Sequence, residues 1–585
     1  MSVADQQQAE PAVLSAPKQP LTSVFSNITF REERFFLALA ILIGILSGLA
    51  VVCFRISIEW SRFVFLGVGA TPSGWRVVLA PVLVGLVVAG LVIRLFPSVR
   101  GSGVNQTKAA LYIYDGFIPF RTAVGKFITS AMAIGAGFSL GPEDPSLQIG
   151  AALASALGRR LHLSRERLRL IAPVGAAAGL AAAFNAPISA VLFVIEEVIG
   201  RWSAGILGAV VLATVSSVMV TRWFLGAAPL FRIPAVEFAH PSELIAYAVL
   251  GVVGGFASVV FCKAIQILRP RLKRAPHWTQ YFQPAVAGLI IGAIGFLGFP
   301  QVMGAGYDVI DRAMHGQFTW EVLGVLAGLK ILSTTLSFVS GTPGGMFAPT
   351  LFIGAMLGGA VGGVEHLFFH QLLPGTVGTY ALVGMGVLFA GFLRAPMTSV
   401  FMVLELSGNY SIIVPVMVAN TLAYLISRAW IPVPIFDLLS RQDGVELPSM
   451  EEERELPILR VEDAMERPKS VVLNGSETIT NTLPVIEKSS EENFLAYDPK
   501  VGWGIISRQA LRSLAADKRR GGVPLTSTYS ENPVPHLFPD SPLELALRYV
   551  YDWPLLPVVH RADPSRLEGV LTVQSVLSKY RSHEP

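Results

Sequence analysis

Long apolar runs alternate with short polar breaks between Phe35 and Leu439. Some of these runs are long enough to predict helices that cross a membrane. Examples are Phe35–Phe54, Trp75–Leu95, Trp202–Met219, Leu244–Ile267 and Val322–Leu336. Others are short or broken by Gly and Pro, namely Gly101–Ile113, Ile149–Leu157, Phe347–Leu357 and Pro396–Leu406. Because a short helix in a bilayer leaves backbone groups unpaired, these segments mark a candidate pathway lined by protein or water.

After the apolar region the pattern changes to a polar tail of about 135 residues, which opens with the charged stretch MEEERELP. Clusters of Val, Leu and Ile, together with Trp503 and Trp553, predict a packed soluble domain. We therefore expect a cytoplasmic tail at 1–30, a membrane domain at 31–442, a linker at 443–460 and a small α/β cytoplasmic domain at 461–585. The halves of the membrane domain are expected near 31–225 and 240–442.

Composition supports the same class. Of 585 residues, 52% are hydrophobic and 15% are charged, which is too apolar for a soluble protein of this size. Residues 1–30 lack a basic segment followed by an apolar core, so no cleavable signal peptide is expected. The basic cluster within 269–274 indicates a cytoplasmic loop, and nucleic acid is not an expected partner. Cys53 and Cys262 lie in apolar segments, so neither a disulfide nor a cysteine metal site is expected.

An internal repeat organises the apolar region. The stretch GPEDPSLQIGA at Gly141–Ala151 returns as GMFAPTLFIGA at Gly345–Ala355, an offset of 204. Two further pairs keep nearly the same offset, namely GSGV at Gly101 with GAGY at Gly304, and Val174–Glu197 with Val383–Leu406. Collinear matches of this kind predict a duplication. Duplicated halves in membrane proteins are typically inverted, with the substrate site near the midplane where interrupted helices meet.

Gly-rich breaks at Gly101, Gly141, Gly304 and Gly345 each precede a helix-like segment. A helix start offers unpaired N–H donors and a partial positive charge, which attract an anion without a full cation in the membrane. The hydroxyl of Ser102 adds a further donor. The alternative is that these glycines only allow close helix packing. Their recurrence in duplicated positions favours an anion pathway.

Glu143 is a carboxylate near the expected membrane centre, where it must be protonated, paired or exposed to water. At a helix start it would occupy the place of an anion and compete with it, so protonation would open the path. The same group would then serve as gate and proton carrier. The alternative is a simple helix cap. For Asp144 we expect a capping role on that same helix.

Glu196 and Glu197 end the segment that begins at Pro187. In the second half Glu405 corresponds to Glu196, whereas Leu406 replaces Glu197. A carboxylate kept in both halves predicts a structural role, such as capping backbone donors. One that occurs in a single half predicts an asymmetric function, so Glu197 is a second candidate proton site.

Four segments, GSGVNQ, GPEDPSLQIGA, FNAPISAVLFVIEE and GTPGGMFAPTLFIGA, occur in this order and spacing. They resemble the signature segments of the CLC family of chloride channels and proton-coupled chloride exchangers over roughly Phe35 to Arg441. The resemblance implies an all-α polytopic fold with inverted repeats and broken helices. It also implies a homodimer in the bilayer with one anion path per subunit.

The resemblance further implies roles for single residues. Ser102 would bind the central anion, and the backbone around Met346 and Phe347 would donate to it. Glu143 would be the gating glutamate, and Glu197 the inner proton-transfer glutamate. Because the family's channels usually replace this second glutamate by an uncharged residue, Glu197 favours an exchanger.

Several positions depart from the family pattern. Pro142 stands where the gate motif usually has a basic residue, and Asp144 adds a carboxylate, so the local positive potential should fall. Asn105 replaces a common proline, and Phe436 replaces a tyrosine that usually contacts the anion, with loss of one hydroxyl donor. Ser102 is the family's usual residue for chloride.

The tail from Val461 to Tyr580 resembles a degenerate pair of CBS repeats. VEDAMERP resembles the entry of such a domain, while GWGIISRQAL and EGVLTVQSVL resemble the closing strand and helix start of each repeat. Nucleotide-binding members commonly have Asp where this chain has Ala510 and Ser575. This puts regulation by an adenine nucleotide in doubt, and a dimerising, structural role is expected at least as much.

Two functions remain open. A proton-coupled chloride exchanger accounts for both Glu143 and Glu197, whereas a passive gated chloride channel accounts only for Glu143. An enzyme is not expected, because the chain has no metal-binding His pair, phosphate-binding Gly-Lys loop or nucleophile with a base. We expect no cofactor, and a location in the cell membrane with both termini in the cytoplasm.

Overall fold

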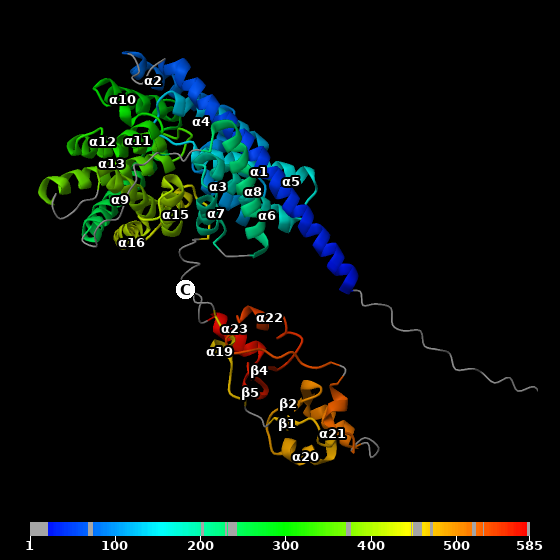
Figure 1. The fold of residues 1–585 in the computed structure, drawn as a ribbon. Coiled ribbons are helices and arrows are strands. Elements are labelled where there is room, and N and C mark those ends of the chain that lie inside the picture. The colour runs from blue at the N-terminus through cyan, green and yellow to red at the C-terminus, as the bar shows by residue number, and fades with distance from the viewer. Residues whose placement is uncertain are drawn as a thin grey trace, which may run out of the picture. The chain divides into compact units, whose positions relative to one another are not determined.

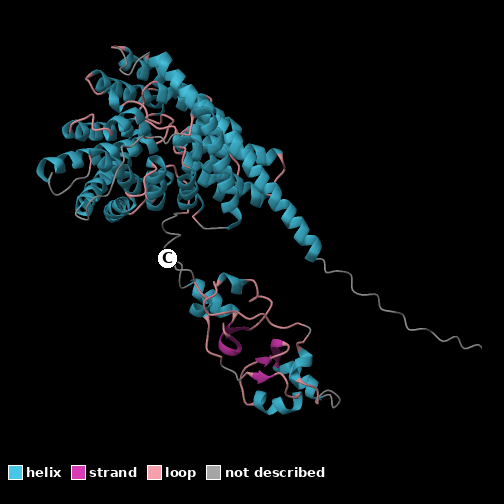
Figure 2. Cartoon of the chain, viewed as in Figure 1, coloured by secondary structure: helices cyan, strands magenta, loops and turns pink. Residues whose placement is uncertain are grey.

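The computed structural model describes residues 22–67, 74–200, 204–227, 231, 243–369, 376–445, 447–448, 459–468, 472–516, 522–530 and 532–581. The chain divides into two compact units, Met1–Glu453 and Arg454–Pro585. Helices build the described part of the first unit, and all described strands lie in the second (Figure 2). Most of the expected N-terminal tail, residues 1–21, and much of the expected linker lie outside the described residues.

The first unit is a bundle of helices of unequal length (Figure 1). Its first half contains α1 (Thr22–Leu66), α2 (Arg76–Arg94), α3 (Gly103–Tyr112), α4 (Phe120–Gly135), α5 (Glu143–Arg160), α6 (Arg165–Phe184), α7 (Pro187–Phe193) and α8 (Ala204–Leu225). Its second half contains α9 (Glu243–Arg274), α10 (Gln283–Phe296), α11 (Tyr307–Met314), α12 (Trp320–Val339), α13 (Phe347–Phe369), α14 (Val377–Leu388), α15 (Pro396–Ser407), α16 (Ile413–Trp430) and α17 (Ile435–Gln442).

Eight helices within the described ranges are long and apolar enough to cross a membrane. The expectation of a short helix at Phe347–Leu357 is wrong, because α13 has 23 residues. Its glycines do not break it but bring it close to α14: a Cβ on Gly358 would lie 2.0 Å from the carbonyl oxygen of Tyr380. Similarly, Ile149–Leu157 is the interior of the 18-residue helix α5. The helix α1 begins at Thr22, inside the expected tail, since neither Gly nor Pro interrupts the chain before Gly44.

The two halves repeat their helix packing. Gly150 of α5 meets Gly175 of α6, and a Cβ on Gly150 would lie 2.1 Å from the Gly175 carbonyl oxygen. Gly354 of α13 meets Gly384 of α14 in the same way, at 2.2 Å. Only glycine allows such an approach of two helix backbones. The repeat seen in the sequence is therefore also a repeat of tertiary contacts.

The second unit is a small α/β domain made of two similar parts. The first contains β1 (Leu473–Asn474), α20 (Ile479–Glu487), β2 (Asn493–Asp498), β3 (Gly502–Ser507) and α21 (Arg508–Ala516). The second contains α22 (Glu544–Leu547), β4 (Leu556–His560), β5 (Asp563–Leu571) and α23 (Val573–Arg581), and α19 (Val461–Ala464) precedes both parts. In the first part β1 is parallel to β2, and in the second a parallel bridge joins Leu537 to Val558 of β4. Both parts therefore follow a β-α-β-β-α order.

Candidate functional site

Two glycines join the starts of α5 and α13. The N–H of Gly141 donates to the carbonyl oxygen of Gly345, and the N–H of Gly345 donates back to Gly141, both at 2.8 Å. Each glycine lies two residues before its helix, which begins at Glu143 or Phe347. The start of α3 contacts α5, because the N–H of Gly103 donates to the side chain of Asp144. Tyr307, the first residue of α11, lines a cavity together with Pro142. The starts of α3, α5 and α13 are therefore joined by hydrogen bonds.

Glu143 is the first residue of α5 and is fully buried. Its Oε2 accepts a hydrogen bond from the N–H of Ala348 in the first turn of α13, at 3.3 Å. Its Oε1 has no hydrogen-bond partner within the part of the chain that the structure describes. The first N–H groups of a helix have no intrahelical acceptor and attract an anion. The carboxylate of Glu143 therefore occupies an anion-attracting helix start.

Asp144 does not cap α5, which corrects the expectation from the sequence. The N-cap of α5 is Pro142, with no side-chain cap hydrogen bond, and the side chain of Asp144 reaches across to α3. Its carboxylate accepts from the hydroxyl of Ser102 at 3.0 Å and from the N–H of Gly103 at 2.9 Å. The Nζ of Lys126 lies 3.7 Å from its Oδ2. Asp144 therefore caps the neighbouring helix, because α3 begins directly in front of it.

Asn105 and Phe436, which both depart from the family pattern, contact each other. The side-chain N–H of Asn105 in α3 donates to the carbonyl oxygen of Phe436 in α17, at 2.8 Å. Phe436 is buried, and its ring centroid lies 6.3 Å from that of Phe347. The proline expected at the position of Asn105 has no donor for this bond. The two departures therefore form one link between α3 and α17.

Aromatic rings surround the first residue of α13. Phe347 and the preceding Met346 are buried, with exposed fractions of 1% and 4%. The ring centroids of Phe193 and Phe389 lie 5.0 Å and 5.9 Å from that of Phe347. A small cavity at this point is lined by Ser102, Asp144, Phe338, Met346, Phe347, Leu393 and Phe436. The structure thus brings Ser102, Met346, Phe347 and Phe436 to one place beside Glu143.

Glu197 lies in a buried cluster that the sequence did not indicate. Its Oε2 is 4.0 Å from the Nζ of Lys108, and that nitrogen is 3.3 Å from the Oδ1 of Asp437. The side chains of all three are at most 6% exposed. An ammonium between two carboxylates offsets part of the cost of burying them. The sequence feature that could have indicated this cluster is Lys108 in an apolar segment, because a cation inside the membrane normally has a partner.

Glu196 and Glu405 each cap a helix in the other half of the membrane unit. Glu196 accepts from the N–H of Thr398 at 3.0 Å and from its hydroxyl at 2.7 Å, at the start of α15. Glu405 accepts from the N–H of Ser189 at 2.7 Å, at the start of α7, and from the Ser189 hydroxyl. The positions of Glu196 and Glu405 differ by 209, and so do those of Ser189 and Thr398. Each carboxylate therefore satisfies otherwise unpaired helix-start donors.

Two cations lie near Pro142, where the family motif usually has a basic residue. Arg55 of α1 lines a cavity of about 530 Å³ together with Glu59, Pro142 and Tyr307, and interacts electrostatically with Glu143. The buried Lys126 of α4 lies against Asp144. Other helices thus supply one cation near Glu143 and one beside Asp144. Both cations lie in apolar stretches of the sequence. The sequence alone does not show which helices they contact.

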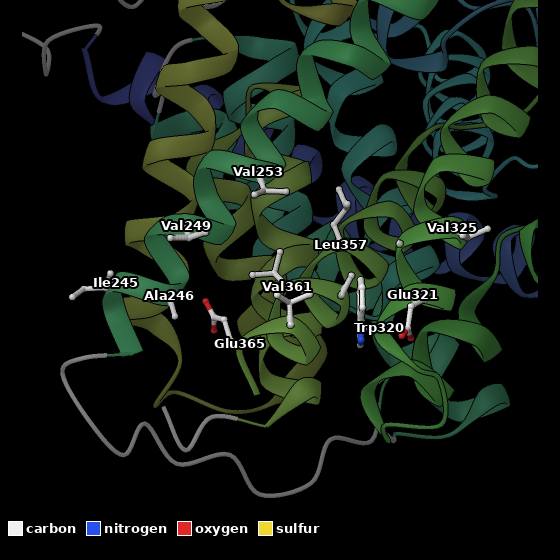
Figure 3. Close-up of a pocket in the computed structure, with 13 residues that line it drawn as sticks. Ile245, Ala246, Val249, Val253, Trp320, Glu321, Val325, Leu357, Val361 and Glu365 are labelled. Carbon is white, nitrogen blue, oxygen red and sulfur yellow. The ribbon is translucent and has the colours of Figure 1, made fainter. Parts of the chain in front are cut away.

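Two other cavities lie away from Glu143. A cavity of about 110 Å³ is lined by Arg100, Gly101, Arg269, Lys273 and Asp443 among others, so it opens next to the chain that enters α3. A wider cavity of about 1020 Å³ lies among α9, α12 and α13 (Figure 3). Its lining is mostly aliphatic, and its charged members, Glu321 and Glu365, are acidic. It offers no cation to an anion.

Comparison with known proteins identifies the family. The family model described as "Voltage gated chloride channel" matches residues 84–428. A putative chloride channel protein, ClcB-like, of Ralstonia nicotianae is 32% identical over 67% of this chain and 94% of its own length. The H(+)/Cl(-) exchange transporter ClcA of Salmonella paratyphi A is 32% identical over 70% of this chain and 89% of its own length.

Among solved structures, a slow cyanobacterial Cl-/H+ antiporter superimposes with a TM-score of 0.64 at 24% identity, over 70% of this chain and 97% of its own. That likeness concerns the fold, which is the bundle of helices of unequal length described above. The family itself follows from the matched family model, which covers more than half of the chain, and from the two curated relatives. The chain belongs to the CLC family of voltage-gated chloride channels, as a multi-pass integral membrane protein.

Proposed function

We propose that the membrane unit exchanges chloride for protons, with Glu143 as the gate and the proton site on one side. The observation that carries this proposal is the bond from the N–H of Ala348 to the carboxylate of Glu143 at the start of α13. A chloride ion and this carboxylate compete for the same donors, because both are anions that suit an unpaired helix start. Protonation removes the charge of Glu143 and frees the donors for chloride. One group then couples the two ions.

Glu197 is the proposed proton site on the other side. It is buried, it has no counterpart at Leu406, and it lies beside α3 through Lys108. The cavity lined by Arg100, Arg269 and Lys273 is the proposed entry for chloride toward α3. Cations at a mouth raise the local concentration of an anion. The two ions would thus reach Glu143 by separate routes on this side.

The experiment is a reversal-potential measurement on the full chain in proteoliposomes with opposed chloride and proton gradients. A coupled exchanger gives a reversal potential that shifts with both gradients, and a chloride gradient drives protons uphill. A reversal potential that ignores pH would instead establish the passive gated channel. Chloride-driven proton uptake in empty liposomes serves as the control.

We also propose that the protein is a homodimer in the cell membrane with both termini in the cytoplasm. The basic cluster at the end of α9 supports this orientation, because Arg269 binds Asp443, the residue after α17, from which the chain continues into the second unit. Exposed apolar side chains of α8 and α16, such as Met219 and Met417, are available to a partner or to lipid. Cross-linking of single cysteines placed on α8 and α16 in native membranes tests the dimer.

For the second unit we propose a CBS-pair-like domain that serves assembly. Its two β-α-β-β-α parts support this reading. A cavity lined by Glu466, Asn493 and Thr572 among others has a volume of about 70 Å³, well below the roughly 300 Å³ of common ligand pockets. Ser575, where an Asp would hold a ribose, is instead bonded to Thr572 at the start of α23. We therefore expect adenine nucleotides to leave the thermal stability of the protein unchanged.

A further inference from the structure

Asp144 binds the first turn of α3 almost as a free anion would. Its carboxylate accepts from the N–H of Gly103 with both oxygens, at 3.0 and 2.9 Å, and from the N–H of Val104 at 3.3 Å. The hydroxyl of Ser102 donates to its Oδ1 at 3.0 Å. Asp144 is 2% exposed, and Lys126, fully buried, lies 3.7 Å away. These are the donors and the countercharge that a helix-start anion site requires.

The hydroxyl of Ser102 is therefore already hydrogen-bonded to Asp144. It has one hydrogen, which it gives to Asp144, and its oxygen accepts the N–H of Val104 at 3.2 Å. Phe436, which lines the same small cavity, has no hydroxyl to offer. The donors that remain beside this cavity belong to the backbone at the start of α13. The cavity itself does not admit a sphere of the size of a water molecule.

We infer that Asp144 is a tethered anion that fills the donor cluster of α3 and thereby lowers the affinity of the pathway for transported chloride. The inference rests on the proposed anion transport and names the residue that sets its affinity. Two mechanisms act together. Asp144 withdraws the Ser102 hydroxyl and the α3 donors from chloride, and its charge repels an anion held at α13 nearby. Lys126 keeps the carboxylate in this position, so the effect is permanent, unlike that of the gate Glu143.

Asp144 thus sets the affinity for chloride, a role distinct from that of Glu143. Glu143 caps α13 with one bond and leaves one oxygen without a described partner. Asp144 uses both of its oxygens on α3. A carboxylate held by several donors leaves them more rarely than one held by a single donor. We therefore expect Glu143 to move during transport and Asp144 to stay.

Chloride binding to the purified full-length protein, measured by isothermal titration calorimetry, tests the inference. Asp144→Asn removes the charge, and Asp144→Gly also frees the donors, so we expect each to bind chloride at least about tenfold more tightly than the unmodified protein. Asp308→Asn is the matched control, because Asp308 lies in the first turn of α11 but is exposed. It is expected to leave the affinity unchanged. An unchanged affinity in Asp144→Asn would overturn the inference.

A double-mutant cycle with Ser102→Ala separates this role from a purely structural one. In the unmodified protein the hydroxyl serves Asp144, so Ser102→Ala is expected to change chloride affinity less than about twofold. In the Asp144→Gly background the freed hydroxyl reaches chloride, and the same substitution is expected to weaken binding about tenfold, the effect of one lost hydrogen bond to an anion. Equal effects in both backgrounds would contradict the inference.

These measurements involve no proton gradient, so they stand apart from the test of exchange. If chloride and proton movement prove uncoupled but the double-mutant cycle gives the expected affinities, Asp144 sets the chloride affinity of a channel. If coupling holds but Asp144→Asn binds no more tightly, only the role of Asp144 is refuted. If Asp144→Gly does not elute as a folded protein, the Asp144→Asn affinity alone decides.

Discussion

Gly141 and Gly345 exchange two backbone hydrogen bonds of 2.8 Å, and this reciprocal pair joins the helix starts of the two halves. The residues lie 204 positions apart, at the head of the two copies of the repeated motif. Antiparallel pairing of these equivalent residues gives the two helix starts a local two-fold relation. Glu143 stands next to this pair in one half only, since Phe347 begins the helix of the other. A symmetric frame thus carries a carboxylate at the helix start of one half only.

Gly141→Ala is expected to disturb the gate. A Cβ at this position would lie 2.2 Å from the Oε2 of Glu143 and 2.9 Å from the Cβ of Ala348, so the carboxylate must move away from α13. We expect chloride flux in proteoliposomes to rise at neutral pH and to depend less on pH. Gly90→Ala in α2 is the control, because a Cβ there meets nothing within 4 Å. If chloride flux through Gly141→Ala depended on pH as in the unmodified protein, the expected displacement of Glu143 would be refuted.

Glu143→Gln is expected to remove the pH dependence of chloride flux. The neutral amide still accepts from Ala348 but has no charge to titrate. In the unmodified protein, lower pH neutralises the carboxylate and flux rises, whereas in the variant flux stays constant between pH 4 and pH 8. Chloride efflux measured with an ion-selective electrode checks this. A variant that still responds to pH would point to another gating group.

Glu197→Gln is expected to abolish proton movement while chloride still moves, because the amide keeps the shape of the side chain but carries no proton in exchange. Proton uptake and chloride efflux are measured on the same liposomes. Glu405→Gln is the matched control, since Glu405 is also a carboxylate in the membrane unit but accepts hydrogen bonds at the start of α7. If coupling survived in Glu197→Gln, the inner proton site would have to lie elsewhere.

Lys108→Met is expected to destabilise the protein by about 3 kcal/mol, because removal of one member of a buried ionic cluster leaves charge without its compensation. Lys108 lies 3.3 Å from Asp437 and 4.0 Å from Glu197. The double variant Lys108→Met with Asp437→Asn should recover part of the loss. Thermal unfolding in detergent measures both. A Lys108→Met protein as stable as the unmodified one would show that the ammonium contributes little.

In the second unit, Asp498→Asn is expected to change the response to acid. The N–H of Lys500 and the hydroxyl of Ser476 hold the pKa of Asp498 below its usual value. A lowered pKa stabilises the folded unit above about pH 4 and loses that effect as the pH falls through the folded value. Hydrogen exchange of β2 should therefore be faster in the variant at pH 7, and the difference should shrink toward pH 3. Asp552→Asn, at an exposed position, is the control.

The sequence by itself determined the class of the protein and the frame of its site. The apolar run Trp75–Leu95 coincides with α2, and Leu244–Ile267 lies within α9, because the length of an apolar run is a local property. The offset of 204 placed Gly141 and Gly345 in equivalent positions before any contact was known. The glycines after Leu357 led to a wrong prediction of a helix end, because Gly358 and its neighbours allow close packing within α13 and do not end it.

The tertiary structure decided which partners the site residues have. Asp144 belongs to α5 but caps α3, and Asn105 binds Phe436 across 331 positions. Lys108 lies beside Glu197, and Arg55 faces the cavity beside Pro142. No local pattern specifies such pairs, because they depend on how distant helices cross in space. Sequence motifs thus located the carboxylates, and only the packing of the helices assigned each of them to a donor.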